Sequence, residues 1–547
     1  MKKIFLPILI FATLVSCKAQ TNNFEISKNL EIYSSVYKSL FQNYVDEINS
    51  GELMRTGIDA MLESLDPYTV YKSESEIEDF RYMTTGQYGG IGALIQQRDG
   101  FVIISEPYQN FPADKAGLVS GDKILKIDDK DLKGKTSSEV SELMKGEPGT
   151  SFEITVERYG EDKPIVKTIT REEVNISPVP YYSITEDGIG YIYLTTFTAD
   201  AGTKFREAYN NLNKDKKLKS LIIDLRGNGG GLLGEAVKII NNFVPKNEVI
   251  VSTKGRIATK NSVHKTMSNP IDTIIPIAVL VNGSSASASE ILSGALQDLD
   301  RAVIVGQRTF GKGLVQNIVP IAYNSQMKVT VAKYYIPSGR CIQAIDYSHK
   351  DAKGNWHKVP DSLMTKFYTR NHRTVLDGAG IKPDVEVELD DAGEITTSLY
   401  VKFLIQEFAT RHYLKHKSEQ FNASTFTVSE ALWNEFLQFL KEKNYVYESS
   451  AEKELEKFVN FTKQDSIYQN VENEINNLKK AIKTSKDKDL ETYRENIEYL
   501  LGMEIATRYG YQNGKIAFGL RKDKIYDEAL SILRDDARYR NILAPVK

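Results

Sequence analysis

Cysteine is almost absent from this chain: there are two, Cys17 and Cys341, in 547 residues. The charge is nearly balanced as well, with a net charge of −3, so the chain has no global positive field that would attract nucleic acid. Apolar runs are short, and none approaches the ~18 residues that a membrane span needs. The composition, 41% hydrophobic and 26% charged, is that of a globular protein. At ~150 residues per domain, the length predicts about three or four domains.

The longest apolar run lies at the N-terminus, where residues 4–16 follow two lysines and lead directly to Cys17. A basic start and a short apolar run are typical of a secretory signal peptide, here residues 1–16. The order of residues before Cys17 resembles a bacterial lipoprotein signal, in which the cysteine is lipidated after cleavage. The alternative is an ordinary signal peptide with an incidental cysteine. Under the lipoprotein interpretation Cys341 has no disulfide partner, and the protein is anchored in the bacterial cell envelope, facing the periplasm.

Hydrophobic periodicity predicts an α/β multidomain protein. Apolar residues at three- and four-residue steps indicate helices before residue 86 and again after residue 385. Between them, short β-branched runs give way to apolar strands that are each followed by a helix, which favours a buried, largely parallel sheet. The predicted parts are the signal peptide 1–16, a helical N-terminal region 17–85, a mainly β module 86–172, an α/β core 173–385 and a helical C-terminal region 386–547.

A glycine-rich turn at residues 229–234 (GGGLLG) fits the G-x-G-x-x-G pattern between a strand and a helix. A dinucleotide-binding fold requires an acidic residue at the end of the next strand, about 20 residues on. Here Glu248 precedes the run Val249–Val251 instead of ending it. A nucleotide site is therefore disfavoured. Such a turn can instead aim backbone N–H groups at a developing anion.

The segment 282–290 (NGSSASASE) contains four serines diluted by alanine. A flexible linker is one interpretation. A second is structural, because Ser287 and Glu290 fit the S-x-x-E capping box at the start of a helix. The third is a serine nucleophile, whose position at a helix N-terminus places the next backbone N–H as an oxyanion donor. The pattern alone does not separate the last two.

A serine nucleophile needs a base, and the six histidines all lie in polar stretches that predict surface positions. They are His264, His349, His357, His372, His412 and His416. A lysine can replace histidine if burial lowers its pKa by roughly three units. Lys312 lies between two glycines with no acidic residue from Arg308 to Gln316, and Gln316 is placed to orient its amine. The alternative is that Lys312 is simply a turn residue.

Several motifs in this order resemble those of the C-terminal processing peptidases. They are residues 64–67 (SLDP), 224–231 (DLRGNGGG), 285–290 (SASASE), 297–298 (QD), 309–313 (TFGKG), 335–340 (YIPSGR) and 380–384 (GIKPD).

The resemblance implies a serine endopeptidase with a Ser-Lys dyad and neither metal nor organic cofactor. It assigns Ser287 as nucleophile and Lys312 as base, because the family's dyad spacing of 25 residues equals 312 − 287. Gln316 matches a supporting glutamine, and Asp298 matches an acid sometimes associated with the site. A helix from Ser287 would place Asp298 about 16 Å away, so a structural role is expected. The expected oxyanion donors are the N–H groups of Ala288 and of Gly230 or Gly231.

The resemblance also identifies the β module as a PDZ domain. Its carboxylate-binding loop would be residues 88–93 (YGGIGA), in which Gly90, Ile91, Gly92 and Ala93 hold the C-terminus of a peptide that adds as a strand. Arg158, expected on the last strand of the domain, would signal occupancy to the protease; an exposed strand charge is the alternative. The expected partners are protein substrates with free C-termini and, through the lipid, a membrane.

A rival class is a catalytically silent PDZ scaffold of the envelope, which would bind peptides without turnover. It leaves the pairing of Ser287 with Lys312 unexplained. A nucleotide-binding enzyme is a third and remote class. The C-terminal helices match no motif, and dimerisation, gating and adaptor docking all remain open for them.

Overall fold

The computed structural model describes residues 5–76, 85–215, 217–347, 350–351, 354–465, 467–486 and 488–545. For residues 5–22, 75, 260 and 361 it describes the backbone alone. The predicted signal peptide and the side chain of Cys17 therefore lie outside the described side chains. The chain divides into two compact units, residues 1–72 with 318–329, and residues 73–317 with 330–547. Each unit is described by itself.

The first unit begins with the predicted helices. Helix α1 is Phe5–Asn43 and α2 is Ser50–Glu63. The side chain of Asn49 caps α2 by accepting hydrogen bonds from the first-turn N–H groups. The helix ends ahead of Asp66-Pro67, as the proline predicts. Strand β1, Val70–Lys72, then pairs antiparallel with the first residues of β18, Gln326–Tyr335.

The mainly β module is confirmed as a small antiparallel sheet with two short helices. Its strand order is β3-β4-β5-β7-β8, so β3 is an edge strand, and β2 and β9 form a separate two-stranded sheet. The core residues Val102, Ile124 and Ile154 are fully buried. The elements are β2 Gln87–Gly90, β3 Ala93–Arg98, β4 Phe101–Pro107, α4 Pro112–Lys115, β5 Lys123–Ile127, β6 Lys130–Asp131, α5 Ser137–Met144, β7 Ser151–Glu157, β8 Ile165–Thr170 and β9 Glu172–Asn175.

The α/β core is built on the predicted, largely parallel sheet. Its strand order is β10-β11-β12-β15-β16-β21, and only the β10–β11 pairing is antiparallel. Every residue of β12 and β15 is buried, which explains their continuous apolar sequences. The strands are β10 Tyr181–Ile184, β11 Ile189–Tyr193, β12 Ser220–Asp224, β15 Ile277–Val281, β16 Val303–Gly306 and β21 Val385–Glu386.

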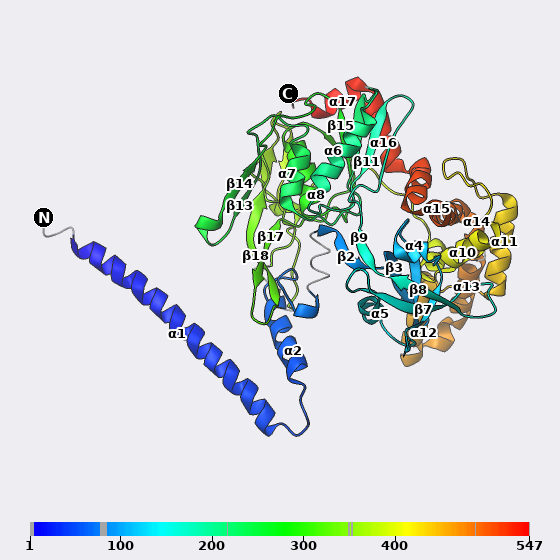
Figure 1. The fold of residues 1–547 in the computed structure, drawn as a ribbon, viewed down its shortest axis with the longest axis horizontal. Helices are drawn as coiled ribbons and strands as arrows, with labels where there is room; N and C mark the ends of the chain where they lie inside the picture. The colour runs from blue at the N-terminus through cyan, green and yellow to red at the C-terminus, as the bar shows by residue number, and fades with distance from the viewer. Residues whose placement is uncertain are drawn as a thin grey trace. The chain divides into compact units, whose positions relative to one another are not determined.

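Helices cover this sheet on both faces. On one face pack α6 (Ala201–Leu212), α7 (Leu233–Ile240) and α8 (Ala288–Asp298), as Figure 1 shows. The other face is covered by α16 (Lys524–Arg534) and α17 (Asp536–Leu543) from the end of the chain. The buried Ile525 and Ala529 of α16 pack there against strand residues such as Leu280. The C-terminal helical region thus supplies one layer of the α/β core.

A second sheet joins β13 Val249–Lys254, β14 Ser262–Lys265, β17 Leu314–Pro320 and β18. Strands β19 Lys366–Tyr368 and β20 Thr374–Leu376 form a hairpin. Short 3₁₀ turns occur at Glu74–Glu76, Ala258–Lys260, Asp361–Leu363 and Leu520–Lys522.

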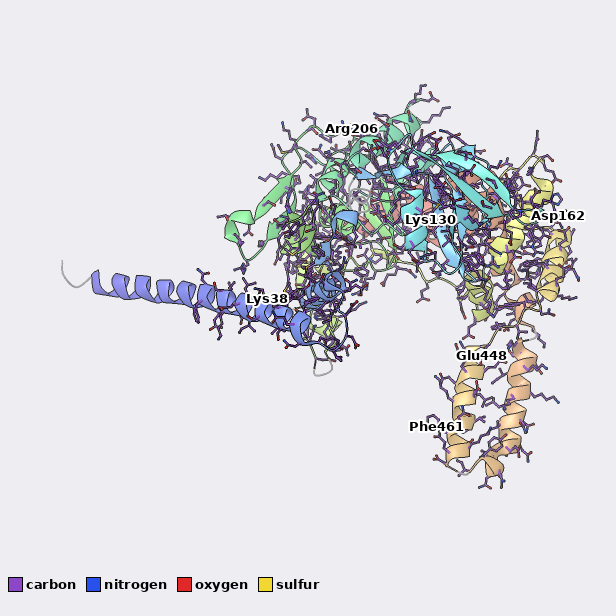
Figure 2. The ribbon with its side chains drawn as sticks, turned by 60° about the horizontal axis from the view of Figure 1, so that its bottom comes forward. Lys38, Lys130, Asp162, Arg206, Glu448 and Phe461 are labelled. Atoms are coloured by element: carbon purple, nitrogen blue, oxygen red, sulfur yellow. The ribbon has the colours of Figure 1, made fainter. Side chains whose placement is uncertain are left out.

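The region after residue 386 is helical, as predicted. Its core gathers around the buried Trp433 and Phe436. Helices α12 and α13 form a hairpin, on which Figure 2 labels Glu448 just ahead of α12 and Phe461 along it. The helices are α9 Glu394–Val401, α10 Leu404–His416, α11 Glu430–Glu442, α12 Ser450–Gln464, α13 Tyr468–Lys486, α14 Asp489–Thr492 and α15 Arg494–Gly519. Across the residues that were searched, those described above, no helix has the length and apolar character needed to cross a bilayer.

Candidate active site

Ser287 is the residue immediately before α8, in the turn that follows β15. Its backbone angles, φ 55° and ψ −111°, lie in a region that non-glycine residues rarely adopt. Such strain persists where surrounding contacts impose it, and it is concentrated at functional sites. Two neighbouring serines have a structural role. The buried hydroxyl of Ser285 donates to the carbonyl oxygen of Leu225, and that of Ser289 donates to the carbonyl oxygen of Asn228, both at 2.8 Å. The segment is therefore an ordered strand-to-helix turn, which rules out the linker.

Glu290 ties the serine turn to the loop that carries Lys312. Its carboxylate is fully buried, and oxygen Oε2 accepts hydrogen bonds from the N–H groups of Ser287 and Lys312, both at 2.8 Å. The other oxygen, Oε1, accepts from the hydroxyl of Thr309 at 2.6 Å and the N–H of Gly311 at 2.7 Å. Burial raises the pKa of Glu290, while these four donors act in the opposite direction. The predicted capping interaction is confirmed, and it also joins both dyad candidates.

Tyr334 on β18 provides a second bridge between the same two residues. Its hydroxyl lies 2.6 Å from the carbonyl oxygen of Lys312 and 3.1 Å from that of Ser287. The side chain is 1% exposed, and burial raises its pKa well above the ordinary value, so it stays protonated as a donor. The backbones of Ser287 and Lys312 are thus held on both sides by buried polar groups.

The glycine-rich turn lies directly beside Ser287. A Cβ atom added to Gly230 would come within 2.8 Å of the Ser287 Cβ and 3.0 Å of the Ala288 nitrogen. The N–H of Gly230 is donated to Asn228 Oδ1 at 2.9 Å, whereas the N–H of Gly231 has no acceptor among the described residues. Ala288 is the first residue of α8, so the helix supplies no acceptor for its N–H.

Asp298 lies at the opposite end of α8 from Ser287. Its buried carboxylate pairs with Arg340 at 2.8 Å and accepts the N–H of Ser338 at 2.9 Å. These contacts anchor the 335–340 motif to the helix and agree with the structural role expected from its distance. Gln316 lies on β17, and its amide donates to the Thr330 hydroxyl at 3.4 Å, a long bond across to β18.

The loop expected to bind a carboxylate leads from β2 into the edge strand β3. Gly92 has φ +68° and lies against Phe111, which a Cβ would approach to 2.4 Å. The carbonyl oxygen of Ile91 accepts the N–H of Ala113 at 2.8 Å, so α4 supports the loop from behind. Gly90 ends β2 and Ala93 begins β3. An edge strand has an unpaired side that an extended peptide can join.

The placement of Arg158 on the last strand is wrong. It follows β7, and β8 comes after it. Nor is it an exposed charge: its guanidinium makes two bonds to the buried Asp122 at 2.8 and 2.7 Å and a third to the Gly117 carbonyl oxygen. The hydrogen bonds to Asp122 raise its pKa. A surface position is also wrong for His412, which is half-buried and stacks on His416.

The sequence missed three residues that organise the site. Glu290 was visible as a helix cap, but its bonds to the Lys312 loop depend on the tertiary fold. Tyr334 carried no local signal, since it belongs to a β strand 47 residues from Ser287. Asp523 lies in the C-terminal helices, which matched no motif, yet its carboxylate forms an ion pair at 2.6 Å with Arg226, just ahead of the glycine-rich turn.

Three family models match parts of the chain. "Peptidase family S41" covers residues 188–349, "PDZ domain" covers residues 103–158, and "Probable PDZ-protease, C-terminal helical domain" covers residues 395–533.

Curated proteins are similar to this chain over more than half of its length. A carboxy-terminal-processing protease of Bartonella bacilliformis is 36% identical over 341 residues, 62% of this chain and 77% of that protein. A probable CtpA-like serine protease of Staphylococcus aureus is 35% identical over 320 residues, 57% of this chain and 62% of that protein. Among solved structures, a photosystem II D1 C-terminal processing protease is 27% identical, with a TM-score of 0.36, covering 65% of this chain and 92% of that one.

Proposed function

The chain belongs to the carboxy-terminal-processing proteases of peptidase family S41 and is a serine-type peptidase with a PDZ domain, and on this premise we propose that Ser287 and Lys312 are its catalytic dyad. The observation that carries the proposal is the shared carboxylate of Glu290, which bonds the backbone N–H groups of both residues. A single buried carboxylate thus ties together the backbones of the proposed nucleophile and the proposed base. The strained backbone of Ser287 and its position at a helix N-terminus support the same assignment.

The proposed reaction is acyl transfer. The neutral amine of Lys312 removes the proton from the Ser287 hydroxyl while the serine oxygen forms a bond to the scissile carbonyl carbon. The negative charge passes to the carbonyl oxygen, and the N–H groups of Ala288 and Gly231 are proposed to stabilise it. The peptide C–N bond then breaks, and Lys312 returns the proton to the leaving amine. Water, deprotonated in the same way, hydrolyses the acyl-enzyme and releases Ser287.

Gly231 is preferred to Gly230 as the second donor because the Gly230 N–H is already donated to Asn228. Gln316 is proposed to support the base from the neighbouring strand β17.

Substrates are proposed to be proteins recognised near a free C-terminus. The carboxylate would bind the backbone N–H groups of the loop Gly90–Ala93, and the preceding residues would pair with the free edge of β3. Leu94 on that strand is 45% exposed and offers apolar surface beside the loop. Cleavage in the protease core then acts on a chain that the PDZ domain already holds.

The protein is also proposed to be a lipoprotein of the bacterial envelope, acylated at Cys17 and facing the periplasm. The support is the basic, apolar and cysteine-terminated pattern of residues 1–17. A lipid on that cysteine would hold the peptidase at a membrane without a spanning helix.

The test is digestion of an unfolded protein with a free C-terminus by wild type, Ser287→Ala and Lys312→Ala. Both variants should retain less than about a thousandth of wild-type activity, since loss of one member of such a unit removes most of its contribution. Undiminished cleavage by either variant would contradict the dyad. The same substrate with an amidated C-terminus should be cut more slowly by wild type.

A further inference from the structure

The end of the C-terminal helical region contacts Arg226, just ahead of the glycine-rich turn that lies beside Ser287. Asp523 lies between α15 and α16, and its Oδ2 is 2.6 Å from Nη1 of Arg226. Arg226 in turn bonds the buried Asp224 at the end of β12, through Nε and Nη2, at 2.9 and 2.5 Å. The guanidinium is therefore held between one carboxylate of the protease core and one of the helical region. Both partners of the Asp523 pair are largely buried, at 16% and 18% side-chain exposure, where an ion pair is weakly screened.

Arg226 begins the turn that carries the proposed oxyanion donor. Gly227 follows it with φ +74° and donates its N–H to Asn282 of the serine turn at 3.1 Å. Next, the carbonyl oxygen of Asn228 accepts the N–H of Ala286 at 3.0 Å. A shift of the Arg226 backbone would therefore be transmitted to Gly231 and to the serine turn together.

Asp523 is itself firmly placed. Its second oxygen, Oδ1, caps α16 by accepting the N–H groups of Ile525 and Tyr526 at 3.0 and 3.1 Å. The buried face of α16 packs on the central sheet, so the cap position is fixed relative to β12 and β15. One carboxylate thus serves two purposes: one oxygen caps the start of α16 and the other holds Arg226.

We propose that Asp523 is a positioning residue for the turn between Arg226 and Gly231, which carries the proposed oxyanion donor. The C-terminal helical region thus helps to build the active site and is not only a docking module. The proposal rests on the Ser287–Lys312 chemistry proposed above. Asp523 does not touch the substrate; it acts through Arg226. Its loss should slow the chemical step and leave recognition of the substrate tail unchanged.

The test compares Asp523→Ser with Asp535→Ser in the full chain. Serine caps helices well but is too short to reach Arg226. Asp535 is the N-cap of α17, where its Oδ1 accepts the N–H of Arg538 at 2.9 Å, so the control loses a cap carboxylate of the same kind. The substrate is an internally quenched peptide with a free apolar C-terminus, and the binding probe is a short fluorescent peptide with the same C-terminus.

Asp523→Ser should lower kcat about tenfold or more, with KM and tail-peptide affinity within twofold of wild type. The assay temperature is well below the melting temperatures of the variant and of wild type. Asp535→Ser should keep wild-type kcat. Asp523→Asn keeps one acceptor oxygen, which can serve the cap or Arg226 but not both, so its kcat should lie between those of Asp523→Ser and Asp535→Ser. It replaces the serine variant if that variant does not fold. If both Asp523 variants retain wild-type kcat, or lose tail binding in proportion to kcat, the positioning role is wrong. Ser287→Ala separates the two proposals: residual cleavage by that variant contradicts the dyad, whereas a normal Asp523 variant beside an inactive Ser287→Ala contradicts only the role of Asp523.

Discussion

The hydroxyl oxygen of Tyr334 lies 2.6 Å from the carbonyl oxygen of Lys312 and 3.1 Å from the carbonyl oxygen of Ser287. One buried phenol on β18 therefore spans the two loops on which the proposed chemistry depends. The arrangement complements Glu290, which receives the N–H groups of the same two residues. Rigid placement of nucleophile and base is expected to matter, because small displacements of reacting groups cost large factors in rate.

Replacing Tyr334 by Phe removes the hydroxyl and keeps the ring. The variant should lose about 1 kcal/mol of unfolding free energy, the net value of a typical hydrogen bond, and its kcat should fall several-fold to tenfold. Urea denaturation and steady-state kinetics measure both. Tyr335→Phe is the matched control: its ring faces Lys254, and a phenylalanine keeps that contact. Equal kinetics for the two variants would show that the Tyr334 bridge is unimportant.

Glu290→Gln changes a carboxylate that accepts four hydrogen bonds into an amide with a single acceptor oxygen. Whichever way the amide faces, two donors lose their acceptor in a fully buried place, so a loss of about 2–4 kcal/mol of unfolding free energy is expected. Activity should fall by more than about a hundredfold, because both loops lose an anchor. Glu207→Gln, on the exposed surface of α6, should change neither quantity. A stable and active Glu290→Gln variant would refute the shared-anchor explanation.

Glu106 gives the fold a measurable pH dependence. Burial raises its pKa above the ordinary 4.5, although the Gln512 amide hydrogen-bonds both carboxylate oxygens. The folded state therefore binds this proton more tightly than the unfolded state. Its contribution is favourable at low pH and is lost as pH rises from about 4.5 through the raised value. The nearby charges are Lys515, Arg508 and Glu504.

Glu106→Gln keeps the shape and removes the charge. The variant should melt at a higher temperature than wild type at pH 8 and at a similar temperature at pH 4. Glu139→Gln should instead melt at a lower temperature than wild type at pH 8, because hydrogen bonds from Lys135 and Thr136 lower the pKa of Glu139 to about 2. Parallel melting curves for Glu106→Gln and wild type across this range would exclude a destabilising charge at that site.

Local sequence patterns predicted much of the fold, and the physical reason is that their signals are local. Continuous apolar runs with glycine-rich turns placed β12 and β15, and the capping box placed the start of α8. The sequence could not show which surface α16 covers, because an apolar stripe on a helix fits many partners.

The site was predictable in part for the same reason. Motif order identified Ser287 and Lys312, but their bridging partners come from tertiary contacts. Tyr334 reaches them from another sheet, and Asp523 comes from the C-terminal helices, where no catalytic motif marks it. The pairing of Arg158 was missed because a charged residue at a strand end gives no sign that a buried carboxylate, Asp122, lies beside it.

The proposed lipid anchor makes a prediction about Cys17. In a bacterial host fed with labelled palmitate, the wild-type chain should become labelled and sediment with membranes. Cys17→Ser should remain unlabelled and appear in the soluble fraction or retain its signal peptide. Cys341→Ser is the control and should behave as wild type. Label on the Cys17→Ser chain would contradict acylation at that residue.

The central claim, a serine activated by Lys312, is tested most directly by the site and rate of reaction with a serine-directed fluorophosphonate. Intact-mass spectrometry with peptide mapping should find a single adduct, on Ser287. Lys312→Met, which keeps the length of the side chain without the amine, should slow the adduct at least a hundredfold while the fold is retained. An adduct on a different serine, or an undiminished rate in Lys312→Met, would contradict the account.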